Sequence, residues 1–253
     1  MIRSTQKLAL SLAEKKPTDL EGTVIIAERQ TDAVGRAGRR WISPAGGIWL
    51  SVVLKPNLLS SQSMLVMFLT TLTVCEVIKS KTGLSPKIKW PNDVTIHGRK
   101  ACGILVNIGA VNETICYAVI GIGINVNNET KRIISEIATS KATGLYGITS
   151  LKKELGGLDV SLVDLLASFL GKLEYYYDQL QQGCHDDIVQ KWKDASESFN
   201  KPIMIKEQDK VFEAIAEDID PSGAIILRTS EGSTRKIFSP EIILTNHRFS
   251  DAE

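Results

Sequence analysis

The hydrophobic pattern of the chain changes after Phe199, and this change limits the fold more than any other feature of the sequence. Before it, stretches with helical spacing alternate with apolar runs of strand length, which indicates an α/β domain. After it, only short β-type runs separated by turn residues remain, which is typical of a small all-β domain. We therefore predict two domains, residues 1–199 and residues 200–253. The short β-type runs are Ile203–Ile205, Val211–Ile219, Ala224–Thr229, Thr234–Phe238 and Ile242–Leu244.

Long helices and several strands are expected in the first domain. Gln62–Thr82 repeats apolar residues at helical spacing and is followed by Gly83, a residue type common just after a helix. Ser161–Leu180 has the same periodicity and begins with a serine that can cap the helix. A further helix follows Ser4. Strands are predicted at Thr23–Ala27, Ile48–Leu54, Ile88–Trp90, Val94–Ile96, Ala101–Ile108 and Ile115–Asn127.

The composition excludes several classes of protein. Of the 253 residues, 43% are hydrophobic and 23% are charged, so the chain is neither disordered nor fibrous. A net charge of +1 argues against a nucleic-acid partner bound by bulk electrostatics. The four cysteines include no C-x-x-C pair, no signal segment follows Met1, and no apolar run has the length of a membrane span. We expect a cytoplasmic protein with no membrane partner.

The first candidate site is the loop Gly35-Arg36-Ala37-Gly38-Arg39-Arg40-Trp41, which lies in a polar stretch over residues 29–47. Its glycines allow the backbone to approach a ligand closely, and its arginines match phosphate or carboxylate oxygens. Trp41 offers a flat ring for stacking. The spacing is not that of a Walker A loop, and a solvated basic loop is the alternative interpretation.

The second candidate is the segment Lys89-Trp90-Pro91-Asn92-Asp93, followed by Gly98-Arg99-Lys100. Asn92 and Asp93 present an amide and a carboxylate together, and such a carboxylate can hold Mg²⁺ or accept a proton. Lys100 directly precedes an apolar strand, so its ammonium lies at the mouth of that strand. A routine hairpin turn is the alternative, because Asn-Asp is common turn chemistry.

The third candidate is the segment Gly121-Ile122-Gly123-Ile124-Asn125-Val126-Asn127. Strand periodicity places the apolar residues on one face and the glycines and asparagines on the other. The glycines leave room for a flat ligand, and an asparagine amide can pair with an adenine edge. A third glycine and a helix start are missing, so the segment is not a Rossmann fingerprint.

The residues outside these segments offer little other catalytic chemistry. There are only three histidines and no evident Ser-His-Asp or Cys-His system. An arginine loop, a lysine, an Asn-Asp turn and a floor for adenine suit chemistry on an anion at a nucleotide phosphate, where positioning and positive charge dominate.

In this order and spacing, the three segments resemble the biotin protein ligase family, the biotin–[acetyl-CoA-carboxylase] ligases, from Ser4 to the end of the chain. The resemblance implies an α/β (α+β) fold of the class II aminoacyl-tRNA synthetase type, with a mixed β-sheet, helices on one side and a C-terminal SH3-like β-barrel. It also implies a reaction in which biotin and ATP, with Mg²⁺, form biotinyl-5′-AMP and pyrophosphate. A lysine of a biotin carboxyl carrier domain then takes the biotin. A homodimer is a further expectation from the resemblance.

The resemblance also assigns roles to individual residues. Arg36, Lys100 and Asp93 are the expected catalytic residues, and the two cations would neutralise the reacting carboxylate and phosphate. The arginine loop would close over the adenylate and keep water from the anhydride. Asn92 and Asp93 are the expected magnesium ligands. The expected biotin-binding residues are Ser4, Thr5, Gln6, Gln30, Val34, Gly35, Arg36 and Lys100. The expected residues for ATP and the adenylate are Gly35, Arg36, Arg39, Trp41, Asn92 and Asn125.

The chain departs from the family pattern at the loop and near its N-terminus. Ala33 and Val34 stand where the family loop often has glycine and arginine, and Gln6 replaces an asparagine. Only three residues precede Ser4, so we do not expect the DNA-binding repressor domain that some family members carry. Two alternatives to the ligase are a non-catalytic sensor of biotin or its adenylate, and a lipoate ligase. The Arg-Arg-x-x-Gly-Gly-Gly loop of the lipoate ligases is absent.

Overall fold

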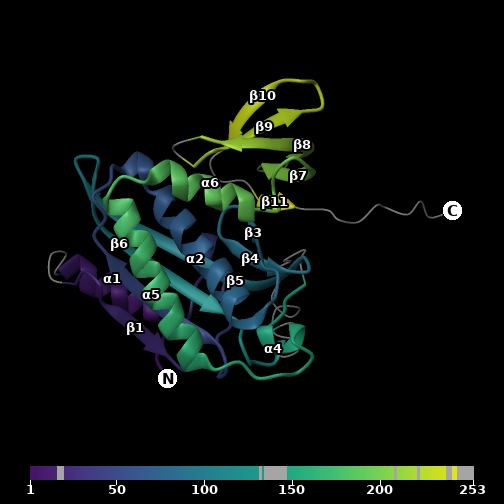
Figure 1. The fold of residues 1–253 in the computed structure, drawn as a ribbon. Coiled ribbons are helices and arrows are strands. Elements are labelled where there is room, and N and C mark those ends of the chain that lie inside the picture. The colour runs from purple at the N-terminus through teal and green to yellow at the C-terminus, as the bar shows by residue number, and fades with distance from the viewer. Residues whose placement is uncertain are drawn as a thin grey trace. The chain divides into compact units, whose positions relative to one another are not determined.

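In the computed structural model the chain forms two compact units, Met1–Ala195 and Ser196–Glu253, and each is described by itself (Figure 1). The structure describes residues 1–15, 20–130, 133, 147–207, 210–220, 223–237 and 241–243. The first unit contains a large sheet with helices, and the second contains a smaller sheet.

A six-stranded sheet forms the centre of the first unit. Its strands are β1 (Val24–Ala27), β2 (Ile48–Leu54), β3 (Lys87–Lys89), β4 (Asp93–Ile96), β5 (Arg99–Val111) and β6 (Thr114–Ile124). They follow the order β1-β2-β6-β5-β4-β3, so the two longest strands lie in the middle. Every pairing between these strands is antiparallel, whereas the resemblance implies a mixed sheet. Parallel pairing occurs between the described residues as isolated bridges, Ile2 with Gln30 and Lys100 with Ile148.

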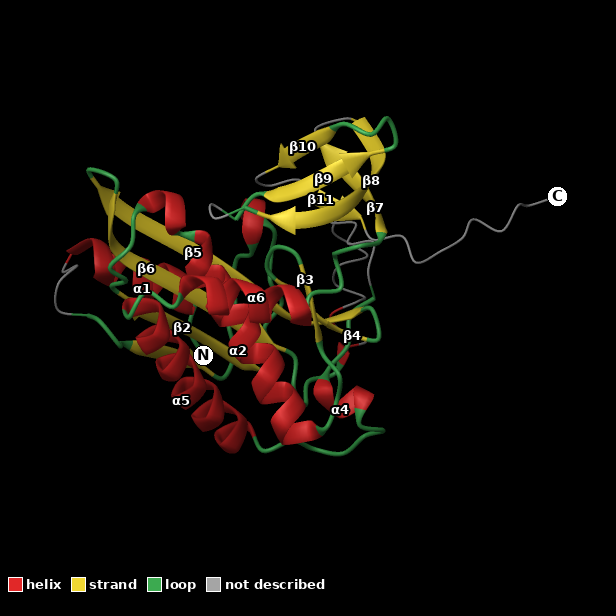
Figure 2. Ribbon diagram, turned by 45° about the horizontal axis from the view of Figure 1, so that its top comes forward, coloured by secondary structure: helices red, strands yellow, loops and turns green. Residues whose placement is uncertain are grey.

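The helices of the first unit are α1 (Thr5–Lys15), α2 (Met64–Thr82), α4 (Leu151–Glu154), α5 (Leu162–Gln181) and α6 (His185–Ala195), with 3₁₀ turns at Arg36–Gly38 and Ser60–Gln62. Helix α2 packs on β3, β4 and β5 and is covered in turn by α5 and α6 (Figure 2). Helix α1 packs on β2 and β6, where Ala9 and Ala13 contact Val53 and Val119.

Helices α1 and α2 cover opposite faces of the sheet. Successive residues of a strand point to opposite faces. On β5, Cys102 interacts with Cys75 of α2, whereas a Cβ at the next residue, Gly103, would meet Trp41. The candidate site therefore lies on the α1 face, and the resemblance-based expectation of helices on one side describes only the layer of α2, α5 and α6.

Helix α2 is a core helix with polar residues tied to its own backbone. The hydroxyls of Thr70 and Thr73 donate to the carbonyls of Val66 and Leu69, each at 2.7 Å. Trp192 of α6 donates from Nε1 to Thr71 Oγ1 at 2.8 Å. By length and composition the segment Ser60–Thr82 could cross a membrane, but 72% of its most apolar window is buried inside the protein.

The second unit is a five-stranded antiparallel sheet with the order β10-β9-β8-β7-β11. Its strands are β7 (Pro202–Glu207), β8 (Lys210–Ile219), β9 (Ile225–Thr229), β10 (Thr234–Ile237) and β11 (Glu241–Ile243). Alternating residues of neighbouring strands fill its core, among them Ile203, Ile205 and Leu227. The five predicted β-type runs correspond to these strands; the run ends expected at Phe238 and Leu244 lie outside the described residues.

Candidate active site

A chain of hydrogen bonds joins the start of α1 to the sheet. Thr5 donates to Gln30 Oε1 from its amide nitrogen at 2.7 Å and from Oγ1 at 3.1 Å. Gln30 Nε2 donates to Ser43 Oγ at 3.0 Å. Ser51 Oγ lies 2.9 Å from both Thr5 Oγ1 and Gln6 Oε1. These residues, far apart in the sequence, form one polar floor on the α1 face of the sheet.

Both the nitrogen and the oxygen of the Gln6 side-chain amide form hydrogen bonds within the protein. Its Nε2 donates to Asn107 Oδ1 and to the carbonyl of Val119, both at 2.9 Å, and the residue is 4% exposed. A Cβ on Gly121 would lie 2.6 Å from Gln6 Oε1, so the glycine leaves the space that this longer side chain fills. Gln6 therefore shapes the floor, because both of its amide hydrogens are already donated within the protein.

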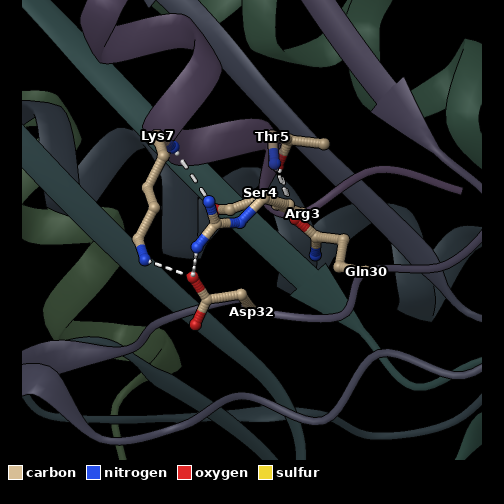
Figure 3. A network of polar contacts seen from close by, with 6 residues as sticks. All are labelled: Arg3, Ser4, Thr5, Lys7, Gln30 and Asp32. Atoms are coloured by element: carbon tan, nitrogen blue, oxygen red, sulfur yellow. Dashed lines mark hydrogen bonds and ion pairs between the residues drawn. The ribbon is translucent and has the colours of Figure 1, made fainter.

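The rim of this floor carries a second network (Figure 3). Asp32 Oδ2 accepts from Lys7 Nζ at 2.6 Å and from Arg3 Nη2 at 3.4 Å. The hydrogen bond and charge of Lys7, with a smaller contribution from Arg3, hold the pKa of Asp32 below its usual value. Ser4 Oγ accepts from the amide of Lys7 at 3.3 Å, which satisfies a donor in the first turn of α1. Ser4 thus caps the start of α1, whereas Gln30 ties α1 to the segment that contains Ser43.

The arginine loop is a small hairpin. Val34 and Arg40 form an antiparallel bridge, and Trp41 N donates to the carbonyl of Ala33 at 2.9 Å. At the tip, Ala37 has a φ of 54°, a left-handed conformation that a residue with a Cβ seldom adopts. Arg36 donates from Nη1 to Asn92 Oδ1 at 3.0 Å. Burial lowers the pKa of Arg36, while the nearby carboxylate of Asp93 raises it.

Lys100 and Trp41 lie together over a floor of glycines. Lys100 Nζ is 2.7 Å from Asp93 Oδ1 and 5.1 Å from the centroid of the Trp41 ring. Gly103 and Gly123 are paired across β5 and β6, and a Cβ on either would fall within 2.8 Å of the indole. The glycine face predicted for a flat ligand is therefore covered by Trp41 in this structure.

Trp41, Lys100 and Asn125 border one small pocket, with a cavity volume of about 40 Å³. Asn125 is 2% exposed, and its Oδ1 accepts from Asn128 Nδ2 at 3.1 Å. Strand β6 ends at Ile124, one residue earlier: the amide of Asn125 still donates to the carbonyl of Ala101 at 2.8 Å, but its own carbonyl accepts from Leu151, the first residue of α4, at 3.0 Å. The remaining lining residues are Arg40, Ile42, Ile133 and Ile148.

Comparison with known proteins identifies the family. The biotin/lipoate A/B protein ligase family matches residues 1–125, and the biotin protein ligase C-terminal domain matches residues 198–244. The bifunctional ligase/repressor BirA of Bacillus spizizenii is 32% identical over 245 residues, which cover 96% of this chain and 72% of that protein. The chain belongs to the biotin protein ligase family.

Other members of the biotin protein ligase family are similar over nearly the whole chain. The biotin–[acetyl-CoA-carboxylase] ligase of Paracoccus denitrificans is 28% identical, over 90% of this chain and 92% of that protein. The structure of a biotin protein ligase from Aquifex aeolicus in complex with biotin and ATP superimposes with a TM-score of 0.72 at 24% identity, covering 96% of this chain and 95% of that chain. The fold is therefore that of the biotin protein ligases.

In this family member, most of the predicted site residues gather on the α1 face of the sheet. Ser4, Thr5, Gln6 and Gln30 build the polar floor and its edge, Val34 and Gly35 form the hairpin, and Arg36 reaches Asn92. Arg39 is exposed on the hairpin. The sequence alone does not single out Ser51, Asn107 or Ile148, because no motif surrounds any of them. Ser51 is the one polar residue in the apolar run of β2, and Asn107 interrupts the apolar run of β5, and these interruptions could have indicated both residues.

Asn92 and Asp93 do not form a metal site by themselves. Asn92 Oδ1 accepts from Arg36, and Asp93 Oδ1 lies against Lys100. Within the described residues, no group of three or more His, Cys, Asp or Glu side chains is placed to hold a metal. Mg²⁺ typically keeps several water or phosphate ligands beside one or two carboxylates. The residues present therefore fit a role in holding the cations of Arg36 and Lys100 better than a role as a resident metal site.

Proposed function

We propose that this chain activates biotin with ATP as biotinyl-5′-AMP and transfers the biotin to a lysine of a biotin carboxyl carrier domain. The observation that carries the proposal is the pocket at which Trp41, Lys100 and Asn125 meet, beside the Arg36 hairpin and the polar floor of α1, in a chain of the biotin protein ligase family. Relatives named as biotin–[acetyl-CoA-carboxylase] ligases support the same activity.

In the first step, a carboxylate oxygen of biotin attacks the α-phosphorus of ATP. The bond from this phosphorus to the bridging oxygen breaks, and pyrophosphate leaves with the electron pair. Two anions must approach each other, so cations held in place lower the barrier by stabilising the charge that develops. Lys100 and Arg36 supply these cations. Asn125 and the indole of Trp41 border the place for the adenine ring, and the indole moves to admit it, because the pocket they line is only about 40 Å³.

In the second step, the amine of the carrier lysine attacks the acyl carbon of the mixed anhydride, and AMP leaves. The attacking amine must lose a proton. The carboxylate of Asp93 is suited to receive it once Lys100 has turned from Asp93 to the phosphate. Closure of the hairpin over the adenylate would keep water from the anhydride until the carrier arrives.

Substrate binding extends from the pocket toward the start of α1. Ser4, Thr5, Gln6 and Gln30 form the floor for the biotin ring system, and Val34 and Gly35 lie along its acyl tail. We expect ATP to arrive as its magnesium complex, with the ion held mainly by phosphates. A cytoplasmic homodimer, acting without a nucleic-acid or membrane partner, is the expected state.

A direct test incubates the purified chain with ATP, Mg²⁺, biotin and a carrier domain and follows the carrier by mass spectrometry. We expect the mass gain of one biotin on one lysine, and pyrophosphate exchange that depends on biotin. Lys100→Ala and Arg36→Ala should each slow adenylate formation by roughly 100-fold or more.

Three results would overturn the proposal or part of it. Tight binding of biotin and ATP without any adenylate would indicate a sensor. Exchange that responds to lipoate instead of biotin would indicate a lipoate ligase. Wild-type turnover in both variants would remove the roles given to Lys100 and Arg36.

A further inference from the structure

Glu154 is a buried carboxylate in a part of the chain that lies between the two ranges matched by the family, residues 1–125 and 198–244. It ends the short helix α4, and its side chain is only 2% exposed. An ionised carboxylate is seldom buried without several donors. The contacts of Glu154 therefore indicate what the residue holds in place.

Three side chains converge on this carboxylate. Arg99 Nη2 and His97 Nδ1 each lie 2.8 Å from it, and Thr149 donates a hydrogen bond from Oγ1. Burial acts to raise the pKa of Glu154, but the hydrogen bonds from Thr149, His97 and Arg99 and the charge of Arg99 outweigh it, so the pKa lies below its usual value. The group is ionised at neutral pH and its partners are fixed by charge-assisted hydrogen bonds.

Two of these partners flank Lys100 in the sequence or in space. Arg99 is its neighbour in the chain. Thr149 N donates to the carbonyl of Lys100 at 2.9 Å, and Lys100 N donates to the carbonyl of Gly147 at 2.8 Å. Residues 147–149 thus pair in parallel with the backbone at Lys100. Glu154 bonds to a residue on each of the two paired segments, Arg99 on one and Thr149 on the other.

The same segment forms a wall of the pocket. Ile148 lines the pocket together with Lys100 and Asn125. The amide of Leu151 donates to the carbonyl of Asn125 at 3.0 Å, and the amide of Lys152 donates to the carbonyl of Val126 at 2.9 Å. A shift of this segment would therefore move Ile148 and change the environment of both Lys100 and Asn125.

We propose that Glu154 is a positioning residue, which fixes residues 147–149 against Lys100 and so holds the Lys100 ammonium beside Asp93 at the pocket. Its effect on turnover rests on the proposed ligase function, whereas its effect on Lys100 itself does not. Displacement of a reacting group by about 1 Å can cost roughly 100-fold in rate, so loss of this support should be visible in the chemical step.

The first experiment measures Lys100 without any catalysis. The full chain is treated with limiting acetic anhydride, and acetylation of Lys100 is compared with that of the exposed Lys79 by peptide mass spectrometry. In Glu154→Gln we expect Lys100 to react several-fold faster relative to Lys79, because its ion pair with Asp93 loosens. Thr149→Val removes one donor and keeps the charge, so it should act in the same direction with a smaller effect.

The second experiment measures coupling to Lys100 through biotin-dependent adenylate formation. Glu154→Gln should lower the rate at saturating ATP and biotin about tenfold or more in the wild-type background, and should have almost no effect in the Lys100→Ala background. Such loss of additivity indicates that the two residues act through one another. If Glu154→Gln merely disturbed the fold, it would lower the rate of adenylate formation by the same factor in both backgrounds.

Glu76→Gln is the matched control. The carboxylate of Glu76 is likewise held by neighbouring side chains: Tyr176 donates to its Oε1 at 2.6 Å, and Lys172 Nζ lies 3.2 Å from its Oε2. It joins α2 to α5, away from the segment 147–149. We expect a similar loss of stability with unchanged Lys100 acetylation and unchanged rate.

The outcomes separate the two proposals. Faster Lys100 acetylation in Glu154→Gln and Thr149→Val supports the positioning role even if the wild type forms no adenylate, a result that would refute only the ligase function. Unchanged acetylation in both variants, or equal effects of Glu154→Gln in the two Lys100 backgrounds, refutes the positioning role.

Discussion

The two cations that we propose as catalytic, Lys100 and Arg36, each have a protein partner in the structure. Lys100 lies 2.7 Å from Asp93, and Arg36 donates to Asn92 at 3.0 Å. Positive charge can thus be held in a partly buried site without an unpaired ion. Burial lowers the pKa of Arg36, but an arginine remains protonated in proteins, so the charge persists when substrate arrives. In the proposed reaction, Lys100 and Arg36 exchange these partners for phosphate and carboxylate oxygens of the substrates.

At the same scale, we predict that Gly123→Ala weakens nucleotide binding. A Cβ at this position would lie 2.5 Å from Trp41 Nε1, so the indole must leave the floor. Such overpacking costs about 1–3 kcal/mol. Isothermal titration with ATP should show at least a tenfold loss of affinity. Gly109→Ala is the control, because its Cβ would meet the Tyr117 ring at 2.3 Å on the same strands but away from the pocket. Equal losses in both variants would contradict the assigned role of the floor.

At the scale of elements, the sequence predicts those parts whose periodicity is long or whose ends are marked. The helix α2 and the strand β2 were predicted almost to the residue. Helix α6 was missed, since its only buried residues are Ile188 and Trp192, which leaves a narrow apolar stripe among charged residues. The strand predicted to end at Asn127 stops earlier: the side chain of Asn127 instead exchanges hydrogen bonds with the backbone of Val160, at 2.8 and 2.9 Å.

The candidate site, like the fold, could be predicted from the sequence only in part. Side chains with distinctive chemistry, such as Lys100 and Trp41, were found from the sequence and lie together at the pocket. The wall formed by Ile148 was not, because backbone hydrogen bonds place it and no residue type marks them. The antiparallel sheet likewise depends on which distant strands pair, and periodicity within a strand carries no information about its partner.

The contact between α2 and α6 gives a prediction about stability. In Trp192→Phe the fully buried Thr71 hydroxyl loses the indole donor and part of the packing volume is lost, so the free energy of unfolding should fall by about 2–3 kcal/mol. Thr71→Val removes the hydroxyl that accepts from Trp192 Nε1 and should cost about 1–3 kcal/mol. We expect urea unfolding to show that the double variant loses less free energy of unfolding than the two single variants lose in sum. Strict additivity would mean that the hydrogen bond contributes nothing.

At the scale of the whole molecule, the net charge of +1 conceals a local concentration of positive charge. Arg36, Arg39 and Arg40 lie on one hairpin, and Lys100 borders the same pocket as Arg40. A near-neutral surface with a small cationic site favours a small anionic intermediate over a polyanion. Most of the binding free energy should therefore appear only when both halves of the adenylate are present and joined.

This leads to a prediction for thermal unfolding in the presence of Mg²⁺. A ligand at 100 times its dissociation constant stabilises the native state by about 2.7 kcal/mol. Biotin and ATP together should raise the unfolding temperature by more than the sum of their separate effects, because the adenylate forms in place and is held by Lys100, Arg36 and the polar floor at once. This additional rise in unfolding temperature should vanish with α,β-methylene-ATP, which cannot release pyrophosphate, and in the Lys100→Ala variant. If the wild type instead shows the same excess with the methylene analogue, the gain comes from cooperative binding of the two substrates, and the adenylate is not the species that the site holds most tightly.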